Sequence, residues 1–250
     1  MHNELHNTLY SDIDTLFFDA GGTLVSIDFA RVCKELSRFG VQCNFEQLQR
    51  AEAAARPIVS EKLAELEPGA GEGLDLFEFF LRTILERLSL QVADASISIP
   101  TISKQLAPIL RPGGRSNQLW SYVLPGVRES LPHFAAMDLK MVVVSNSDGT
   151  VEQLMHESGL RPFFDAVVDS HVIGYAKPDP RIFEHALTVS GSDASRTLHV
   201  GDMYYADIVG AEAAGIRAVL LDPFDNWTGY DCPRLPDLPA LYREMARARG

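Results

Sequence analysis

Residues 15–24 read TLFFDAGGTL, an apolar run that ends in a carboxylate, two glycines and a hydroxyl. The short segment Thr15–Phe18 is apolar and aromatic and is bounded by polar residues and glycines, which predicts a buried β-strand. Asp19 follows this strand directly. Ligands of open parallel sheets bind at the carboxyl ends of the strands, so Asp19 stands where a binding site is expected.

Four more short apolar runs have the same character and predict further strands: Lys140–Val144, Ala166–Val168, Thr197–Val200 and Arg217–Leu221. Such strands suit a parallel sheet that is covered on both faces. Helical patterns alternate with them, namely Val151–Ser158, a helix behind Asp179 and Pro180, and Ala206–Ala214. This alternation predicts an α/β fold with a doubly wound, Rossmann-like parallel sheet.

The stretch from about Ser26 to Asn117 interrupts the alternation. It contains the helical patterns Phe29–Phe39, Phe45–Ala55, Leu74–Leu90 and Ile102–Leu110, with glycine- and proline-rich segments at 68–73 and 111–114. We therefore expect two domains, an α/β core of residues 1–25 plus 118–250 and an inserted helical domain of residues 26–117. The core is expected to resume near Tyr122, and Leu124–Val127 is expected to lead into a core helix.

Composition narrows the possible partners. The chain has 250 residues, of which 46% are hydrophobic, and this is enough for a substantial core. A formal net charge of −12 argues against nucleic acid or an anionic membrane as a partner. Residues 1–11 show no signal peptide, and no apolar run reaches the length of a membrane span, so a cytoplasmic location is expected. Nothing in the sequence indicates an oligomeric state.

Three residues that follow predicted strands, Asp19, Ser145 and Asp202, are expected to converge at one edge of the sheet. A carboxylate can attack phosphorus and form an aspartyl-phosphate once the negative charges are neutralised. A Mg²⁺ ion held by carboxylates does this. Asp19 and Asp202 are the predicted metal ligands, Gly21 can add its backbone carbonyl, and Asp19 is the predicted nucleophile.

The oxygens of a transferring phosphoryl group need hydrogen-bond donors. Thr23 and Ser145 supply hydroxyls, and Asn146 supplies a backbone N–H. Lys177 supplies a fixed positive charge. Asp207, in the first turn of the helix after the fourth strand, is expected to orient Lys177 or a metal-bound water.

Four motifs carry a resemblance to a known family: DAGGT at 19–23, SN at 145–146, GYAKPDP at 174–180 and GDMYYAD at 201–207. In this order they resemble the motifs of the haloacid dehalogenase-like hydrolase superfamily, and the last two are the more specific. The resemblance covers about residues 15–222. It implies a catalytic Asp19 and Lys177, Mg²⁺ as cofactor and a small phosphorylated substrate. In position and length, the helical insertion resembles the α-helical cap of that superfamily.

Gly21 departs from the pattern, because the phosphatases of the superfamily usually have a second Asp there. That Asp protonates the leaving oxygen and helps to activate water, and a positioned acid–base is worth about 10²–10⁴-fold in rate. Three interpretations stay open. The substrate has a good leaving group, such as an acyl phosphate, a phosphoanhydride or an aryl phosphate; a residue of the cap or near His171 replaces the acid; or the site binds with little turnover.

The sequence thus predicts a Mg²⁺-dependent hydrolase of a small phosphorylated metabolite that acts through an aspartyl-phosphate. One alternative is a catalytically weak binding or regulatory protein. Another is a hydrolase of the dehalogenase or phosphonatase type. The dehalogenases have an aromatic residue where Gly21 stands and need no Mg²⁺, and the phosphonatases use a cap lysine. The lysines of the insertion are Lys34, Lys62 and Lys104.

Overall fold

The computed structural model describes residues 9–66, 74–88, 98–114 and 119–249. A six-stranded parallel sheet forms its centre, in the order β5–β4–β1–β6–β7–β8. The strands are β1 (Thr15–Phe18), β4 (Lys140–Ser145), β5 (Ala166–Asp169), β6 (Thr197–Gly201), β7 (Arg217–Leu221) and β8 (Arg234–Leu235). The first five were predicted, and β8 is additional. The predicted α/β fold class is confirmed.

The register of β1 aligns the strand ends that matter for the site. Thr15 is opposite both Lys140 of β4 and Thr197 of β6, so the three central strands run level with one another. The ladder continues one step past the strand, because the Asp19 N–H donates to the Val200 carbonyl (2.9 Å). The residues that follow β1, β4 and β6 therefore meet at one edge of the sheet.

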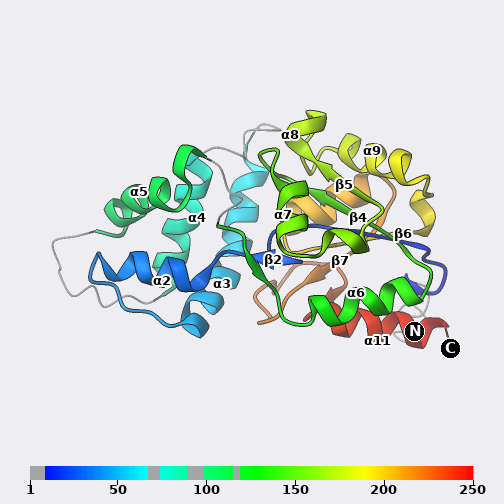
Figure 1. Cartoon of the computed structure of the whole chain (residues 1–250), viewed down its shortest axis with the longest axis horizontal. Helices are drawn as coiled ribbons and strands as arrows, with labels where there is room; N and C mark the ends of the chain where they lie inside the picture. Colours follow the sequence, from blue (N-terminus) through cyan, green and yellow to red (C-terminus); the bar gives the residue numbers. More distant parts are fainter. Residues whose placement is uncertain (1–8, 67–73, 89–97, 115–118, 250) are drawn as a thin grey trace.

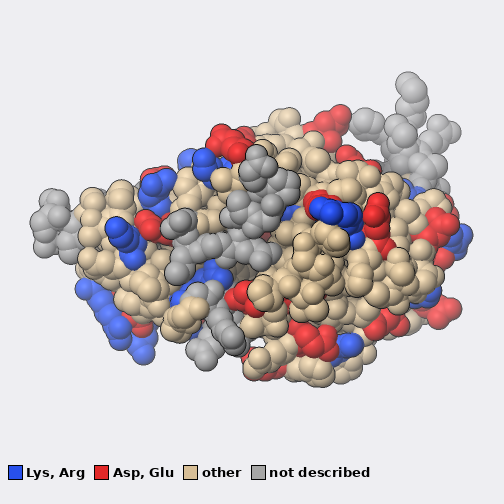
Figure 2. All heavy atoms as spheres, turned by 90° about the horizontal axis from the view of Figure 1, so that it is seen from above, with Lys and Arg blue, Asp and Glu red and all other residues tan. Residues whose placement is uncertain are grey.

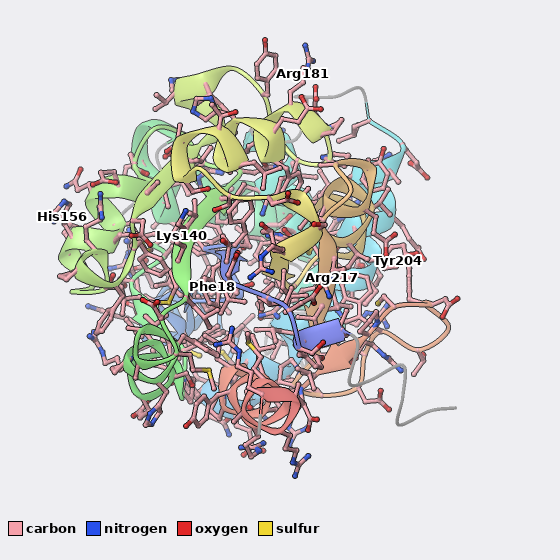
Figure 3. All side chains as sticks on the ribbon, turned by 90° about the vertical axis from the view of Figure 1, so that its right-hand side faces the viewer. Phe18, Lys140, His156, Arg181, Tyr204 and Arg217 are labelled. Carbon is pink, nitrogen blue, oxygen red and sulfur yellow. The ribbon has the colours of Figure 1, made fainter. Side chains whose placement is uncertain are left out.

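Helices cover both faces of the sheet (Figure 1). Strand residues alternate between the faces, so Phe18 belongs to one apolar cluster and Phe17 to the other. The first face is covered by α6 (Val127–Ala136), α7 (Val151–Glu157) and α11 (Leu238–Arg249). The second is covered by α8 (Ser170–Ile173), α9 (Pro180–Ser190) and α10 (Gly210–Ala213). Figure 3 shows Phe18 near the centre of the molecule, with His156 and Arg181 at its periphery.

Between β2 (Val25–Ser26) and β3 (Tyr122–Val123), the described residues form four helices: α2 (Phe29–Ser37), α3 (Phe45–Ala64), α4 (Leu74–Arg87) and α5 (Ile99–Leu110). They surround an apolar cluster of their own and extend to the left of the sheet in Figure 1. β2 and β3 pair antiparallel where the chain leaves the sheet and returns to it. The predicted segment 68–73, residues 89–90 of the third predicted helix and the predicted boundary at 117 lie outside the described residues.

Helix α3 is longer than predicted. It begins with a capping box between Asn44 and Gln47 and continues through Pro57 to Ala64, whereas the sequence pattern ends at Ala55. A proline inside a helix removes a hydrogen bond and costs about 3 kcal/mol. Contacts between these added turns and the residues around the central sheet stabilise them. In one of these contacts the Tyr205 N–H donates to Ser60 Oγ (2.9 Å). The predicted end was wrong because these tertiary contacts outweigh the proline.

The remaining elements are short. In the part of the chain that the structure describes, the 3₁₀ turns are η2 (Pro112–Gly114), η3 (Arg161–Phe163) and η4 (Ala194–Arg196). A π-helical turn, η5 (Tyr204–Val209), leads into α10. None of the helices in the described residues is both long and apolar enough to cross a bilayer. On the face seen in Figure 2, basic and acidic side chains are both present, with several Lys and Arg groups towards the left end, where α2 and α5 lie.

Candidate active site

Lys177 joins two of the predicted site carboxylates. Its Nζ donates to Asp19 Oδ1 (2.5 Å) and to Asp207 Oδ1 (2.6 Å), and its side chain is buried. Burial would lower the pKa of this ammonium group, but the two carboxylates raise it well above its usual range. Lys177 is therefore a permanent cation at the carboxyl ends of β1 and β6.

Asn146 holds the loop that carries Lys177. The Lys177 backbone N–H donates to Asn146 Oδ1 (2.7 Å), and Asn146 Nδ2 donates to the Lys177 carbonyl (2.9 Å). The side-chain amide, next to Ser145 at the end of β4, is thus engaged with protein backbone. The helix α9 that follows is capped by Asp179, whose side chain accepts from the Arg181 N–H.

Asp207 is saturated with hydrogen bonds. Its Oδ2 accepts from the backbone N–H groups of Asp202 (3.1 Å) and Met203 (2.9 Å), and its Oδ1 contacts His199 Nε2 (2.9 Å) as well as Lys177. Burial acts to raise its pKa, but Lys177 and His199 hold the pKa of Asp207 well below its usual range. The π-helical turn brings the carboxylate back onto β6. A Cβ on Gly201 would lie 2.1 Å from Asp207 Cγ, which explains the glycine before Asp202.

Asp202 pairs with an arginine that the sequence analysis missed. Arg56, on the extended part of α3, places its Nε 3.3 Å from Asp202 Oδ2. Glu52, one turn earlier, holds the guanidinium at two points, with Nε 3.1 Å and Nη2 2.8 Å away. All three side chains are buried. The i,i+4 spacing of Glu52 and Arg56 could have indicated that these two side chains interact on one helix. The sequence carries no signal for the contact between Arg56 and Asp202.

The carboxylates have a chemistry that suits a divalent cation. Single oxygens of Asp19, Asp202 and Asp207 lie within 4.8 Å of one another. Burial raises the pKa of Asp19 to about 6 and the pKa of Asp202 well above its usual range. Among the described residues, Asp202 Oδ1 is buried without a hydrogen-bond partner. Since Asp207 is already saturated, Asp19 and Asp202 are the two residues that fit Mg²⁺, which prefers carboxylate oxygens.

A cavity of about 250 Å³ opens onto these groups. Asp19, Gly21, Ser145, Lys177 and Asp202 form its polar side. Its other side comes from the helical insertion and the segment before β3. The apolar members there are Val59, Leu63, Phe77, Phe80 and Trp120, and the charged ones are Glu52, Arg56 and Arg111. A cavity of this size with convergent polar groups is the expected form of a small-molecule site.

One of the predicted positions differs from expectation. Thr23 is not among the residues that line this cavity, since its buried side chain lies beside a second cavity of about 190 Å³. The chain turns back after Gly22, whose N–H donates to the Val25 carbonyl (2.6 Å), and this turn carries Thr23 away from Asp19. Gly21 does line the main cavity, and the indole of Trp120 fills the space beside it. A Cβ built on Gly21 would lie 2.9 Å from Trp120 Nε1.

Gly22 leads to a test of the packing around Asp202. Its φ is +82°, and a Cβ there would lie 2.2 Å from Asp202 Oδ2. Gly215 is a matched control, because its φ is +74° and nothing lies within 4 Å of its Cβ position. Both alanine variants carry left-handed strain, but only Gly22→Ala displaces Asp202. We expect Gly22→Ala to melt lower than Gly215→Ala by on the order of 5 °C in circular dichroism, and equal melting temperatures would contradict this.

Comparison with known proteins agrees with this geometry. The family model described as haloacid dehalogenase-like hydrolase matches residues 13–215. The chain therefore belongs to the haloacid dehalogenase-like hydrolases, an enzyme family, as the sequence motifs predicted.

Individual relatives differ in how much of the chain they match. The chain is 33% identical over 177 residues to haloacid dehalogenase-like hydrolase domain-containing protein 3 of Bos taurus, covering 69% of this chain and 68% of the relative. It is 29% identical over 212 residues to pyrimidine 5'-nucleotidase YjjG of Escherichia coli, covering 84% and 86%. The solved structure of a phosphatase of this family from Thermococcus onnurineus has a TM-score of 0.57 at 18% identity, covering 95% and 99%. This last likeness shows the fold.

Proposed function

We propose that the protein is a Mg²⁺-dependent hydrolase of a small phosphorylated metabolite, with Asp19 as the nucleophile. The observation that carries this proposal is the pair of buried ion pairs that Lys177 makes with Asp19 and Asp207. These three residues line the same cavity as Asp202. The similarity to a protein named as a pyrimidine 5'-nucleotidase supports a phosphate ester as substrate. Asp19 and Asp202 would hold the ion, with the Gly21 carbonyl as a further ligand.

The residues at the strand ends have separate tasks in this reaction. Asp19 attacks phosphorus through a carboxylate oxygen, the bond to the leaving oxygen breaks, and the group departs with the electron pair. Lys177 neutralises the phosphoryl oxygens, the Ser145 hydroxyl helps to orient them by a hydrogen bond, and Asp207 positions Lys177. Water then hydrolyses the aspartyl-phosphate, which releases phosphate and restores Asp19. When bound, Mg²⁺ supplies charge neutralisation between the carboxylate and the phosphate.

The domain division belongs to the same proposal, with residues 26–117 as a cap over an α/β core of residues 1–25 and 118–250. The apolar cluster shared by α2–α5 supports it. In the phosphonatase alternative a cap lysine would reach the substrate, but Lys34, Lys62 and Lys104 do not line the cavity. His171 does not line it either, and its ring lies near Gly149. The cytoplasmic location and the absence of a nucleic-acid partner stay predictions.

A metal-dependence assay tests the proposed function. We expect the protein to hydrolyse phosphate esters with Mg²⁺, to lose turnover with a chelator and to regain it when Mg²⁺ is added back. Turnover that is unaffected by the chelator would contradict the metal part of the proposal. Failure to hydrolyse any member of a broad panel of phosphate esters, acyl phosphates and phosphoanhydrides would favour the alternative of a binding or regulatory protein.

A further inference from the structure

The ring of Trp120 has a defined position beside Gly21. It packs against the apolar clusters of both the sheet and the helical insertion, and its centroid lies 5.9 Å from that of Phe77. The preceding residue, Leu119, is buried and accepts a hydrogen bond from the Asp28 N–H (2.7 Å). The indole is thus fixed in the space that a side chain at position 21 would need.

The indole N–H faces this space. A Cβ on Gly21 would lie 2.9 Å from Trp120 Nε1 and 3.3 Å from Cδ1, so the pyrrole edge of the ring points to position 21. Within the described part of the chain, no residue accepts a hydrogen bond from this N–H. A tryptophan N–H is a donor only. It can hold a leaving oxygen by a hydrogen bond, but it cannot protonate that oxygen as a carboxylic acid would.

The wall next to Trp120 is aromatic. Phe77 and Phe80 of α4 line the same cavity, and the guanidinium of Arg111 lies 5.1 Å from the centroid of the Phe77 ring. Aromatic rings bind other rings in offset or edge-to-face arrangements. A flat aromatic leaving group could pack against Phe77 and Trp120 while its phosphate lies at the strand ends.

We propose that Trp120 selects phosphate monoesters of phenols, in which the ring of the leaving group packs against Trp120 and Phe77. This inference rests on the proposed function. A phenol has a pKa of about 10, the value of the tyrosine side chain, so an aryl oxide departs without a proton donor. The bond from Asp19 to phosphorus forms, the bond from phosphorus to the aryl oxygen breaks, and the oxygen keeps the electron pair. Trp120 donates a hydrogen bond to that oxygen, which later takes a proton from water.

Fluorescence tests the binding part without any need for turnover. The chain has two tryptophans, and the second, Trp227, is buried in the cluster on the other face of the sheet. We expect 4-nitrobenzylphosphonate to quench the emission of wild type and of Trp227→Phe, and methylphosphonate to leave it unchanged. The quench should be lost in Trp120→Phe. A quench that persists in Trp120→Phe, or no quench in wild type, overturns the inference.

Kinetics test the selectivity. Wild type should have a kcat/KM for phenyl phosphate at least tenfold above that for glycerol 2-phosphate. Trp120→Leu should raise KM for phenyl phosphate roughly tenfold, while inhibition by inorganic phosphate stays as in wild type. Trp120→Phe, which keeps a ring, should lower kcat on phenyl phosphate by on the order of 10²-fold, as expected for the loss of one preorganised donor.

The outcomes separate the two proposals. The inference about Trp120 fails if wild type has the same kcat/KM for glycerol 2-phosphate and for phenyl phosphate. It also fails if Trp120→Leu lowers kcat/KM for both substrates by the same factor. In either case the proposed hydrolase stands. If wild type hydrolyses no phosphate ester and binds neither inorganic phosphate nor methylphosphonate, the proposed function fails. The fluorescence experiment would then still show whether 4-nitrobenzylphosphonate binds beside Trp120, because it does not depend on turnover.

Discussion

Asp19→Asn is expected to abolish hydrolysis of phenyl phosphate, with a fall in kcat on the order of 10⁴-fold or more, because an amide cannot attack phosphorus to form an acyl phosphate. The fold should survive, since asparagine has the same shape and keeps an oxygen for the contact with Lys177 (2.5 Å in the native pair). The measurement is steady-state turnover at saturating Mg²⁺. It is paired with acid quenching of a ³²P-labelled substrate, which should label wild-type protein only.

The control for this experiment is Asp193→Asn. Asp193 is exposed at the start of η4, where its side chain accepts from the Ser195 N–H (2.8 Å), and it does not line the cavity. This variant should retain wild-type turnover and labelling. If Asp19→Asn retained turnover or covalent label close to those of wild type, the nucleophile would have to be another residue.

Lys177→Met is expected to be the most destabilising change in the site, and it should also remove activity. The methionine leaves Asp19 and Asp207 buried without the cation that contacts both. Removal of one partner of a buried ion pair costs about 3–5 kcal/mol in free energy of unfolding. The measurement is urea denaturation at pH 7 with no divalent cation present.

The loss in free energy of unfolding caused by Lys177→Met should depend on pH in a defined direction. In wild type, Lys177 and His199 hold the pKa of Asp207 below its usual range, so this group contributes stability above its unfolded pKa. In Lys177→Met the buried Asp207 carboxyl has lost its cation, so its folded-state pKa rises above the unfolded value. The folded state then binds more protons than the unfolded state, and the free energy of unfolding falls as pH increases. The difference in free energy of unfolding between wild type and Lys177→Met should therefore be largest near pH 8 and should decrease towards pH 4.

Lys140→Met is the matched control. Lys140 is exposed at the start of β4, where its Nζ donates to the carbonyls of Ser190 (2.9 Å) and Gly191 (3.0 Å). Surface substitutions of this kind change stability by about 0.5 kcal/mol, with no widening at high pH. If Lys177→Met were no less stable than Lys140→Met, the buried carboxylates would have another source of compensation.

Much of the fold could be predicted because its signals are local. The five apolar runs became strands of the central sheet, and Asp19, Ser145 and Asp202 meet because parallel strands end at one edge. The strands β2, β3 and β8 have two residues each and no pattern of their own. They form only because distant parts of the chain bring their partners to them.

The missed parts of the site have the same explanation. Arg56 lies one residue beyond the predicted helix end at Ala55. Helix α3 continues past Arg56 because contacts with the core, such as that between Ser60 and Tyr205, hold its last turns. Trp120 carries no local signal, because its place beside Gly21 depends on the path by which the chain returns to the sheet. Thr23 was predicted from its neighbours in sequence, but the turn at Gly22 buries it elsewhere.

The pairing of β2 with β3 has a consequence for how such a protein can change over evolution. Val25 is opposite Val123, so the chain departs and comes back through adjacent, hydrogen-bonded points. Whatever is spliced between these points leaves the register of the parallel sheet untouched. The helices between these points can thus be lengthened or exchanged while the strand ends that carry Asp19, Ser145 and Asp202 stay in place.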